Sequence, residues 1–77
     1  MFGKKSTVRL EVHPTSGSAT KKDVEIEGTG VSLKEFLKAN GLSDKNMNVT
    51  VDSEPAVPTT HVGKGATVKL TEKVRGS

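Results

Sequence analysis

The sequence predicts a small α+β roll, in which one helix packs on one face of a mixed sheet of four or five strands. Three observations lead to this fold class. Segments near both ends of the chain alternate apolar and polar residues, which is the pattern of half-buried strands. One short central segment has the apolar spacing of a helix. A helix this short is stable only when it packs on a sheet, and we expect the first and last strands to be adjacent at the sheet centre.

The first part of the chain predicts a β-hairpin. Residues 7–12 alternate strictly between polar and apolar side chains. Residues 13–18 are rich in proline, glycine and hydroxyl residues, which are typical of a loop. A second alternation follows over residues 23–27 and is broken at residues 28–30 by two glycines. Two alternating segments joined by a turn-rich connection indicate a hairpin with a long loop.

The helix is predicted over residues 33–40. Ser32 and Glu35 form a capping box, in which the Ser32 hydroxyl accepts a hydrogen bond from the Glu35 amide. Gly41 is placed to take the left-handed conformation that ends many helices. The apolar stripe of this helix consists of Leu33, Phe36 and Leu37.

The residue pattern in the second part of the chain predicts three more extended segments. Residues 47–51 alternate as a third strand. Residues 56–58 form a short extended piece that neighbouring prolines confine to a sheet edge. After a turn at residues 63–65, residues 66–74 form the final strand. Residues 75–77 carry no core-forming side chain, and we expect them to form a flexible tail.

The bulk composition bounds the chemistry. A chain of 77 residues forms one domain, here residues 1–74. The absence of cysteine excludes disulfides, thiolate metal sites and a cysteine nucleophile. His13 and His61 lie in separate predicted loops without further ligands at metal-binding spacing. The sequence also lacks the Gly-x-Ser-x-Gly elbow of a serine hydrolase. We therefore predict no catalytic residue, no metal, no cofactor and no enzymatic activity.

The charge pattern predicts a soluble protein, and the absence of cysteine fits a cytoplasmic location. The net charge is +3, and the lysines are interspersed with acidic residues. No apolar run approaches the roughly 20 residues that span a bilayer, and the N-terminus lacks the apolar segment of a signal peptide. Two Phe and no Tyr or Trp argue against stacking on nucleic-acid bases. Weak phosphate attraction, and with it a nucleic-acid accessory role, stays open for Lys21, Lys22, Lys69 and Lys73.

Three motifs carry a resemblance to a known family. Residues 51–58 read Val-Asp-Ser-Glu-Pro-Ala-Val-Pro, residues 62–68 place a Gly-Lys-Gly turn before an apolar strand, and residues 74–77 read Val-Arg-Gly-Ser. Together with the order of elements, they resemble the ubiquitin-like β-grasp family, most closely the small sulfur carriers of thiamin and molybdopterin biosynthesis. Those proteins typically show a Val-Asn-Gly-Glu turn, a Gly-Asp turn and a Gly-Gly terminus. Here Lys-Gly stands where Gly-Asp is common, and Ser77 replaces the last glycine.

The resemblance implies a non-enzymatic carrier. Its protein partner would be an ATP-dependent adenylating enzyme that activates the C-terminal tail, Arg75, Gly76 and Ser77. We expect the partner to bind the sheet face that carries Lys69, Thr71 and Lys73.

The hydroxymethyl group of Ser77 adds bulk beside the reacting carboxylate, where small misplacements are costly. Three explanations stay open: Ser77 is removed to expose Gly76, Ser77 is not part of the natural terminus, or this lineage has lost conjugation. The alternative function is a β-grasp protein–protein interaction module, an adaptor or assembly component, without C-terminal chemistry.

Overall fold

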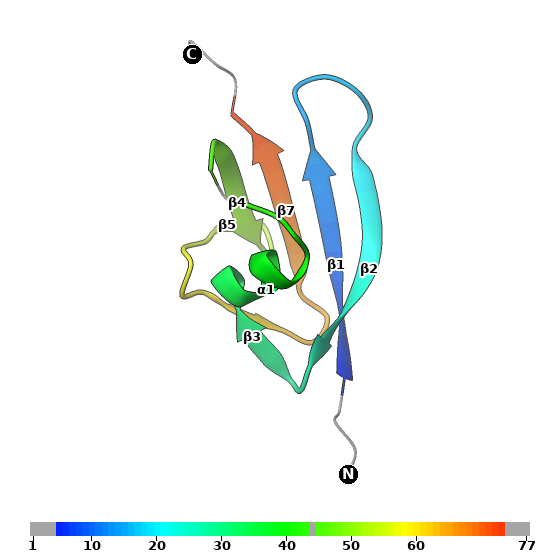
Figure 1. The fold of residues 1–77 in the computed structure, drawn as a ribbon, viewed down its shortest axis with the longest axis vertical. Helices are drawn as coiled ribbons and strands as arrows, with labels where there is room; N and C mark the ends of the chain where they lie inside the picture. Colours follow the sequence, from blue (N-terminus) through cyan, green and yellow to red (C-terminus); the bar gives the residue numbers. More distant parts are fainter. Residues whose placement is uncertain (1–4, 44, 74–77) are drawn as a thin grey trace.

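One helix and a mixed five-stranded sheet form the domain, as the sequence predicted (Figure 1). The computed structural model describes residues 5–43 and 45–73. In chain order the elements are β1 (Lys5–His13), β2 (Thr20–Glu27), β3 (Gly30–Ser32), α1 (Leu33–Ala39), β4 (Met47–Val51), β5 (Glu54–Pro55), β6 (His61–Gly63) and β7 (Thr67–Glu72).

The strand order of the main sheet is β2-β1-β7-β4-β5. β1 pairs antiparallel with β2 and parallel with β7, and β7 pairs antiparallel with β4. The prediction that the first and last strands lie side by side at the sheet centre is therefore confirmed. This arrangement is compatible with a β-grasp-like fold.

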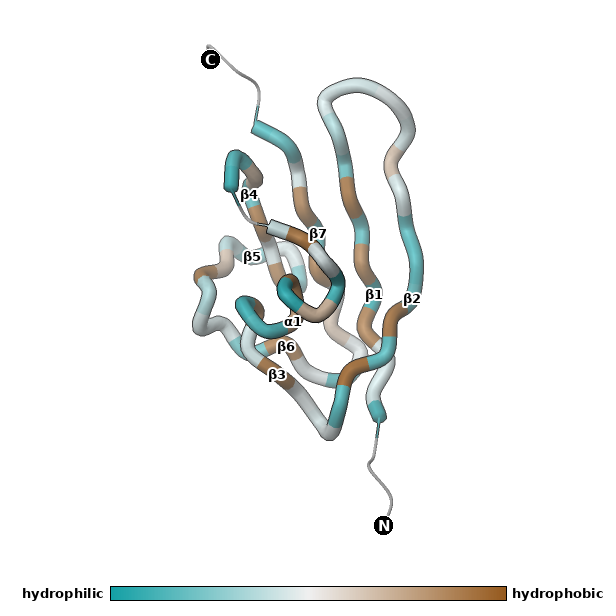
Figure 2. Tube along the Cα trace, viewed as in Figure 1, coloured by the Kyte–Doolittle hydropathy of each residue, from teal (hydrophilic) through white to brown (hydrophobic). Residues whose placement is uncertain are grey.

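The hydrophobic core lies between the helix and the central strands. Val8 and Leu10 of β1 lie on the same face of the sheet as Val68 and Leu70 of β7. All four side chains are at most 2% exposed. Figure 2 shows apolar residues recurring along both strands. The helix contributes its predicted stripe, Leu33, Phe36 and Leu37, each at most 5% exposed. Burial of aliphatic side chains at about 25 cal/mol per Å² is the main source of stability for a domain with so few aromatic residues.

Both ends of α1 have the predicted caps. The Glu35 amide donates to Ser32 Oγ at 3.3 Å, which is the hydroxyl half of the capping box. At the other end Gly41 has φ +68°. The amide of Leu42 donates to the Leu37 carbonyl at 2.8 Å, and the Gly41 amide donates to the Lys38 carbonyl at 3.2 Å. These bonds form a Schellman motif, which satisfies carbonyls that the helix end leaves free.

Several predicted boundaries were wrong. β2 begins at Thr20, three residues before the predicted start, and β7 is described only over Thr67–Glu72 rather than residues 66–74. Val74 lies outside the described residues. The predicted edge strand at residues 56–58 is instead β5, Glu54–Pro55, because a two-residue turn places these residues directly opposite Val51 and Thr50.

A second, two-stranded sheet of β3 and β6 was not predicted. Each strand has three residues, too few to show an alternation. Gly30 pairs with Gly63, and the His61 ring lies across Gly30, where a Cβ atom would stand 2.2 Å from His61 Cε1 and 3.0 Å from the Val62 carbonyl oxygen. Glycine at position 30 therefore allows the ring to cover the strand pair.

The turn between β4 and β5 is strained. Asp52 has φ +53° and Ser53 has φ +70°, the two positive values of a type I′ hairpin turn. Asp52 has a structural reason to be there, because its Oδ1 accepts a hydrogen bond from the Thr67 amide at 3.0 Å. The Ser53 side chain has no such bond among those of the described residues, while its Cβ disfavours the left-handed region.

We predict that Ser53→Gly stabilises the domain by about 0.5–1 kcal/mol, because glycine takes positive φ without steric cost. The melting temperature should rise by several degrees, since 1 kcal/mol corresponds to roughly 4–8 °C in a domain of this size. Asp52→Gly is the matched control: it relieves the same kind of strain but removes the Thr67 contact, and should not stabilise. Thermal unfolding followed by circular dichroism checks both, and a lower melting temperature for Ser53→Gly would contradict the strain assignment.

Candidate interaction surface

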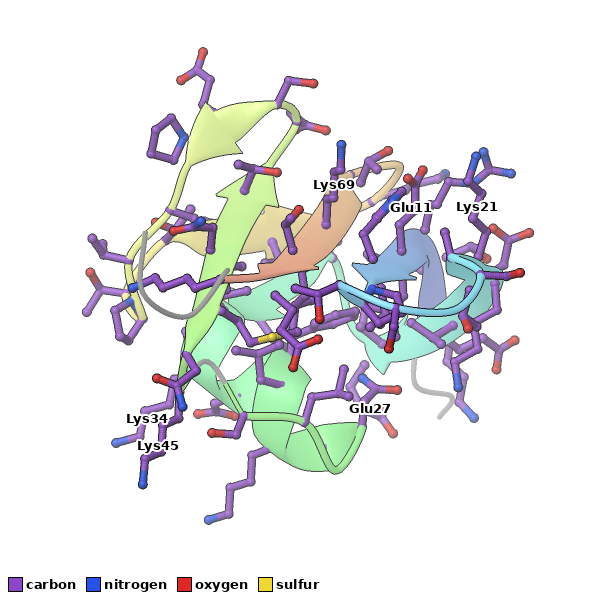
Figure 3. The ribbon with its side chains drawn as sticks, turned by 90° about the horizontal axis from the view of Figure 1, so that it is seen from above. Glu11, Lys21, Glu27, Lys34, Lys45 and Lys69 are labelled. Atoms are coloured by element: carbon purple, nitrogen blue, oxygen red, sulfur yellow. The ribbon has the colours of Figure 1, made fainter. Side chains whose placement is uncertain are left out.

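The face of the main sheet opposite the helix is polar, and we call it the open sheet face. Strand alternation and register assign to it Thr7, Arg9, Glu11 and His13 of β1, Lys21 and Asp23 of β2, Thr67, Lys69 and Thr71 of β7, and Asn48 and Thr50 of β4. Figure 3 shows Lys69, Glu11 and Lys21 on one side of the sheet and Lys34 and Lys45 on the other. The sequence had already placed the polar residues of the first and last strands on the face away from the core.

Lys69 lies at the centre of this face. In the register of the sheet its neighbours are Glu11 on β1 and Thr50 on β4. Thr71, the next residue on the same face of β7, lies between His13 and Asn48 and is half-buried. Lys73 is exposed and comes one residue after β7 ends. The structure therefore brings Lys69 and Thr71 together on one face and places Lys73 at the end of the strand.

Charges of both signs alternate beside Lys69. His13 Nε2 lies 3.1 Å from Glu11 Oε1. This hydrogen bond, with the positive charges of Lys21 and Arg9 nearby, lowers the pKa of Glu11 below its ordinary value. Arg9 Nε lies 3.9 Å from Asp23 Oδ1, and both side chains are more than half exposed. An exposed pair of this kind contributes little to stability, and the exposure of Arg9 and Asp23 leaves both side chains accessible to a binding partner.

A hollow of about 520 Å³ lies at one end of the open sheet face, beside the turn at residues 63–65. Its charged lining consists of Lys5, Arg9, Lys64 and Asp23. The backbone amides of this turn are already used: Lys64 donates to the Thr29 carbonyl and Gly65 to the Thr7 carbonyl. The hollow therefore offers an anion only flexible side chains, without a backbone cradle.

Thr50 carries the one buried side-chain polar atom that lacks a hydrogen-bond partner among the described residues. It stands on the open sheet face between Lys69 on β7 and Pro55 on β5. Leaving a buried hydroxyl without a partner costs about 1–3 kcal/mol. Nothing in the sequence distinguishes this threonine from the exposed ones.

The end of β7 is held by two other parts of the chain. The amide of Thr15, in the β1–β2 loop, donates to Glu72 Oε1 at 2.9 Å, and the Thr15 hydroxyl donates to the same oxygen at 3.1 Å. The Lys73 amide donates to the Asn46 carbonyl at 3.0 Å. The two Thr15 bonds lower the pKa of Glu72 below its ordinary value. The predicted tail, Arg75 to Ser77, lies outside the described residues.

The sequence did not reveal the contact between Thr15 and Glu72, because the two residues lie at opposite ends of the chain. The sequence also did not identify the neighbours of Lys69 on β1 and β4. The alternation of residues 7–12 indicated only which residues of the first strand lie on its polar side. Among residues 5–43 and 45–73, no three His, Asp or Glu side chains are grouped to hold a metal ion. In the same ranges no helix has the length and hydrophobicity to cross a lipid bilayer.

We predict that the anchor at Glu72 is lost in acid. A lowered folded-state pKa means that the contact adds stability above the ordinary glutamate value of 4.5, and that this contribution is lost as the pH falls through the lower folded-state value. The amide proton of Thr15 should therefore titrate in NMR spectra with a midpoint below 4.5. Glu72→Gln should abolish that titration, whereas Glu54→Gln should leave it unchanged. A Thr15 amide that does not respond to pH in the unmodified protein would contradict the contact.

We predict that Thr50→Val stabilises the domain by about 1 kcal/mol, because valine keeps the β-branched shape and removes the unpartnered hydroxyl. Thr7→Val, at an exposed position of the same sheet face, should change the stability by less than about 0.5 kcal/mol. Urea unfolding measures both differences. A loss of stability in Thr50→Val would show that the hydroxyl has a hydrogen-bond partner in solution.

Comparison with known proteins leaves the family of this chain open. No model of a protein family matches it, and no curated protein sequence does. Among solved structures, it is similar to a superantigen-like protein from Staphylococcus aureus, with a TM-score of 0.39 and 16% sequence identity. The similarity covers 94% of this chain and 53% of that protein, so this chain spans about half its length. A likeness at this level carries no information about function.

Proposed function

We infer that this protein is a non-enzymatic carrier of the ubiquitin-like kind. It docks on a partner protein through Lys69, Thr71 and Lys73 and presents the segment that follows β7 to that partner. The observation that carries this proposal is the position of β7. It is the central strand of the sheet, paired on both sides, and its end is held by Thr15 and Asn46.

A held strand end suits presentation of the following segment. Fixing the base of a short tail restricts the directions in which the tail leaves the domain, and this lowers the entropy that binding must remove. Lys69, Thr71 and Lys73 lie on β7 or just beyond it. A partner that covers them therefore also faces the start of the tail. The strand order with one helix on one face is compatible with the β-grasp fold of the family that the sequence resembles.

The partner proposed from that resemblance is an ATP-dependent adenylating enzyme. An oxygen of the C-terminal carboxylate attacks the α-phosphate of ATP, the bond to the pyrophosphate group breaks, and an acyl-adenylate forms. Gly76 suits a narrow channel because it has no Cβ atom. Removal of Ser77 places the Gly76 carboxylate at the terminus.

The second candidate is an interaction module without C-terminal chemistry. The mixed charges around Lys69 favour it, because they can recognise a partner whether or not a tail is used. Glu11, Arg9 and Asp23 form this pattern on β1 and β2, away from the end of β7. Electrostatic complementarity of this kind contributes mainly to specificity and to the association rate.

We predict that a chain ending at Gly76 supports ATP–pyrophosphate exchange by an adenylating enzyme of its own host. Lys69→Glu should raise the KM of the enzyme for this chain about tenfold, which corresponds to about 1.4 kcal/mol of docking energy. The matched control is Lys45→Glu, an exposed lysine on the other side of the sheet, which should have no effect.

The outcome separates the two candidates. Absence of exchange with chains ending at either Gly76 or Ser77 would refute the carrier. Capture of a host protein that depends on Lys69 but is indifferent to deletion of residues 75–77 would support the interaction module instead. Intact mass of the protein from its native host, showing an end at Gly76 or the exchange of oxygen for sulfur, would support the carrier independently.

A further inference from the structure

A groove on the helix side of the domain is separate from the open sheet face. It lies between α1, the segment that follows α1, and the connection from β5 to β6, and it has a volume of about 390 Å³. We call it the helix groove. It is lined by Lys34, Leu37, Lys38, Leu42, Ser43 and Pro58. Volumes of this size are typical of sites that take a small ligand or one or two side chains of a partner.

The floor of the helix groove is aliphatic. Leu37 is buried in the core, Leu42 is half-buried against it, and Pro58 is exposed beside them. Val57, the residue before Pro58, is 59% exposed and is the one large hydrophobic side chain that the described residues expose. Val57 does not line the groove itself, but a peptide that extends past Pro58 along the chain would remove this side chain from water as well.

Hydrogen bonds hold the walls of the groove in place. The Lys34 amide donates to the Pro58 carbonyl at 3.0 Å, which ties the start of α1 to the β5–β6 connection. The Leu42 amide donates to the Leu37 carbonyl at 2.8 Å, which fixes the other wall. Thr60 closes the connection itself, because its amide donates to the Val57 carbonyl and its hydroxyl accepts from the Val57 amide, both at 2.9 Å. A groove formed before binding costs little entropy to fill.

The described residues that line the groove carry positive charge alone. Lys34 and Lys38 are the ionisable residues in its lining, and neither takes part in an ion pair among the described residues. They lie one helical turn apart, where like charges repel each other. Glu35 does not line the groove; it lines a second hollow on the other side of α1, to which Lys34 and Lys38 also contribute. An anionic group bound at the groove would relieve the repulsion between Lys34 and Lys38.

We propose that the helix groove binds an extended acidic peptide segment of a partner protein, with a bulky aliphatic side chain on the floor and carboxylates at Lys34 and Lys38. The aliphatic floor favours a peptide over a nucleic acid, because it offers no aromatic ring on which a base can stack. The N-terminal residues of this chain, with Lys4 and Lys5, have the wrong charge to occupy it. The groove and the open sheet face lie on opposite sides of the sheet, so the protein can hold two partners at once.

The probe for this proposal is a short fluorescent peptide in which two adjacent leucines are flanked by glutamates. Its binding to the full chain is measured by fluorescence anisotropy, and its position by NMR shift changes at Leu42, Ser43 and Val57. Lys34→Glu and Lys38→Glu should each weaken binding by about tenfold or more, because like charges then face each other. Val57→Ser should weaken it by about threefold through lost apolar contact. Lys22→Glu, at an exposed lysine of β2 that does not line the groove, is the matched control and should bind normally.

Three results would overturn the proposal. The first is that the peptide does not bind to the unmodified chain, while circular dichroism shows that this chain is folded. The second is equal binding of a peptide whose leucines are replaced by glycine, which would show that charge alone drives the contact. The third is equal competition by a single-stranded oligonucleotide of the same net charge, which would identify a general polyanion site. None of these depends on the C-terminal tail, so the test is independent of the carrier proposal.

Discussion

The parallel pairing of β1 with β7 is the contact on which the rest of the structure depends. It joins residues 9–13 to residues 67–71, from opposite ends of the chain. Without it, the β1–β2 hairpin and the strands β7, β4 and β5 would form two separate sheets, each with one more unpaired edge. The inner side of this pair carries Val8, Leu10, Val68 and Leu70, the four buried side chains over which the helix packs. The hydrophobic core, the continuous sheet and the position of the helix therefore all depend on the pairing of β1 with β7.

This pairing also gives the domain two different surfaces. On the open sheet face, it places Glu11 beside Lys69 and so forms a mixed pattern of charges. On the other side, α1 covers the core and leaves the helix groove between its own surface and the β5–β6 connection. The same pairing puts β7 at the sheet centre, where Thr15 and Asn46 hold its end. Binding of one partner to the sheet would leave the helix groove free.

The predictions from sequence succeeded where local pattern decides structure and failed where it does not. The alternations in β1, β4 and β7 were found because each strand buries one face, and the caps of α1 because Ser32 and Gly41 act on neighbouring backbone. β3 and β6 were missed because three residues show no alternation and their pairing needs both partners. The extended piece predicted at residues 56–58 lies two residues after β5, because the turn at Asp52 and Ser53 brings Glu54 and Pro55 opposite β4, and a proline can occupy an edge strand.

The sequence by itself determined the α+β class, the apolar faces and both ends of the helix, because these depend on spacing between near neighbours. Only the tertiary structure decided which polar residues meet. The sequence predicted that Lys69 lies on the polar face of the last strand. Its neighbours Glu11 and Thr50 follow from the order and register of the strands. The hydrogen bonds from the Thr15 amide to Glu72 and from the Lys34 amide to the Pro58 carbonyl are likewise products of the tertiary structure. Each unites segments far apart in the chain, and no local periodicity records which distant segment a strand or helix will contact.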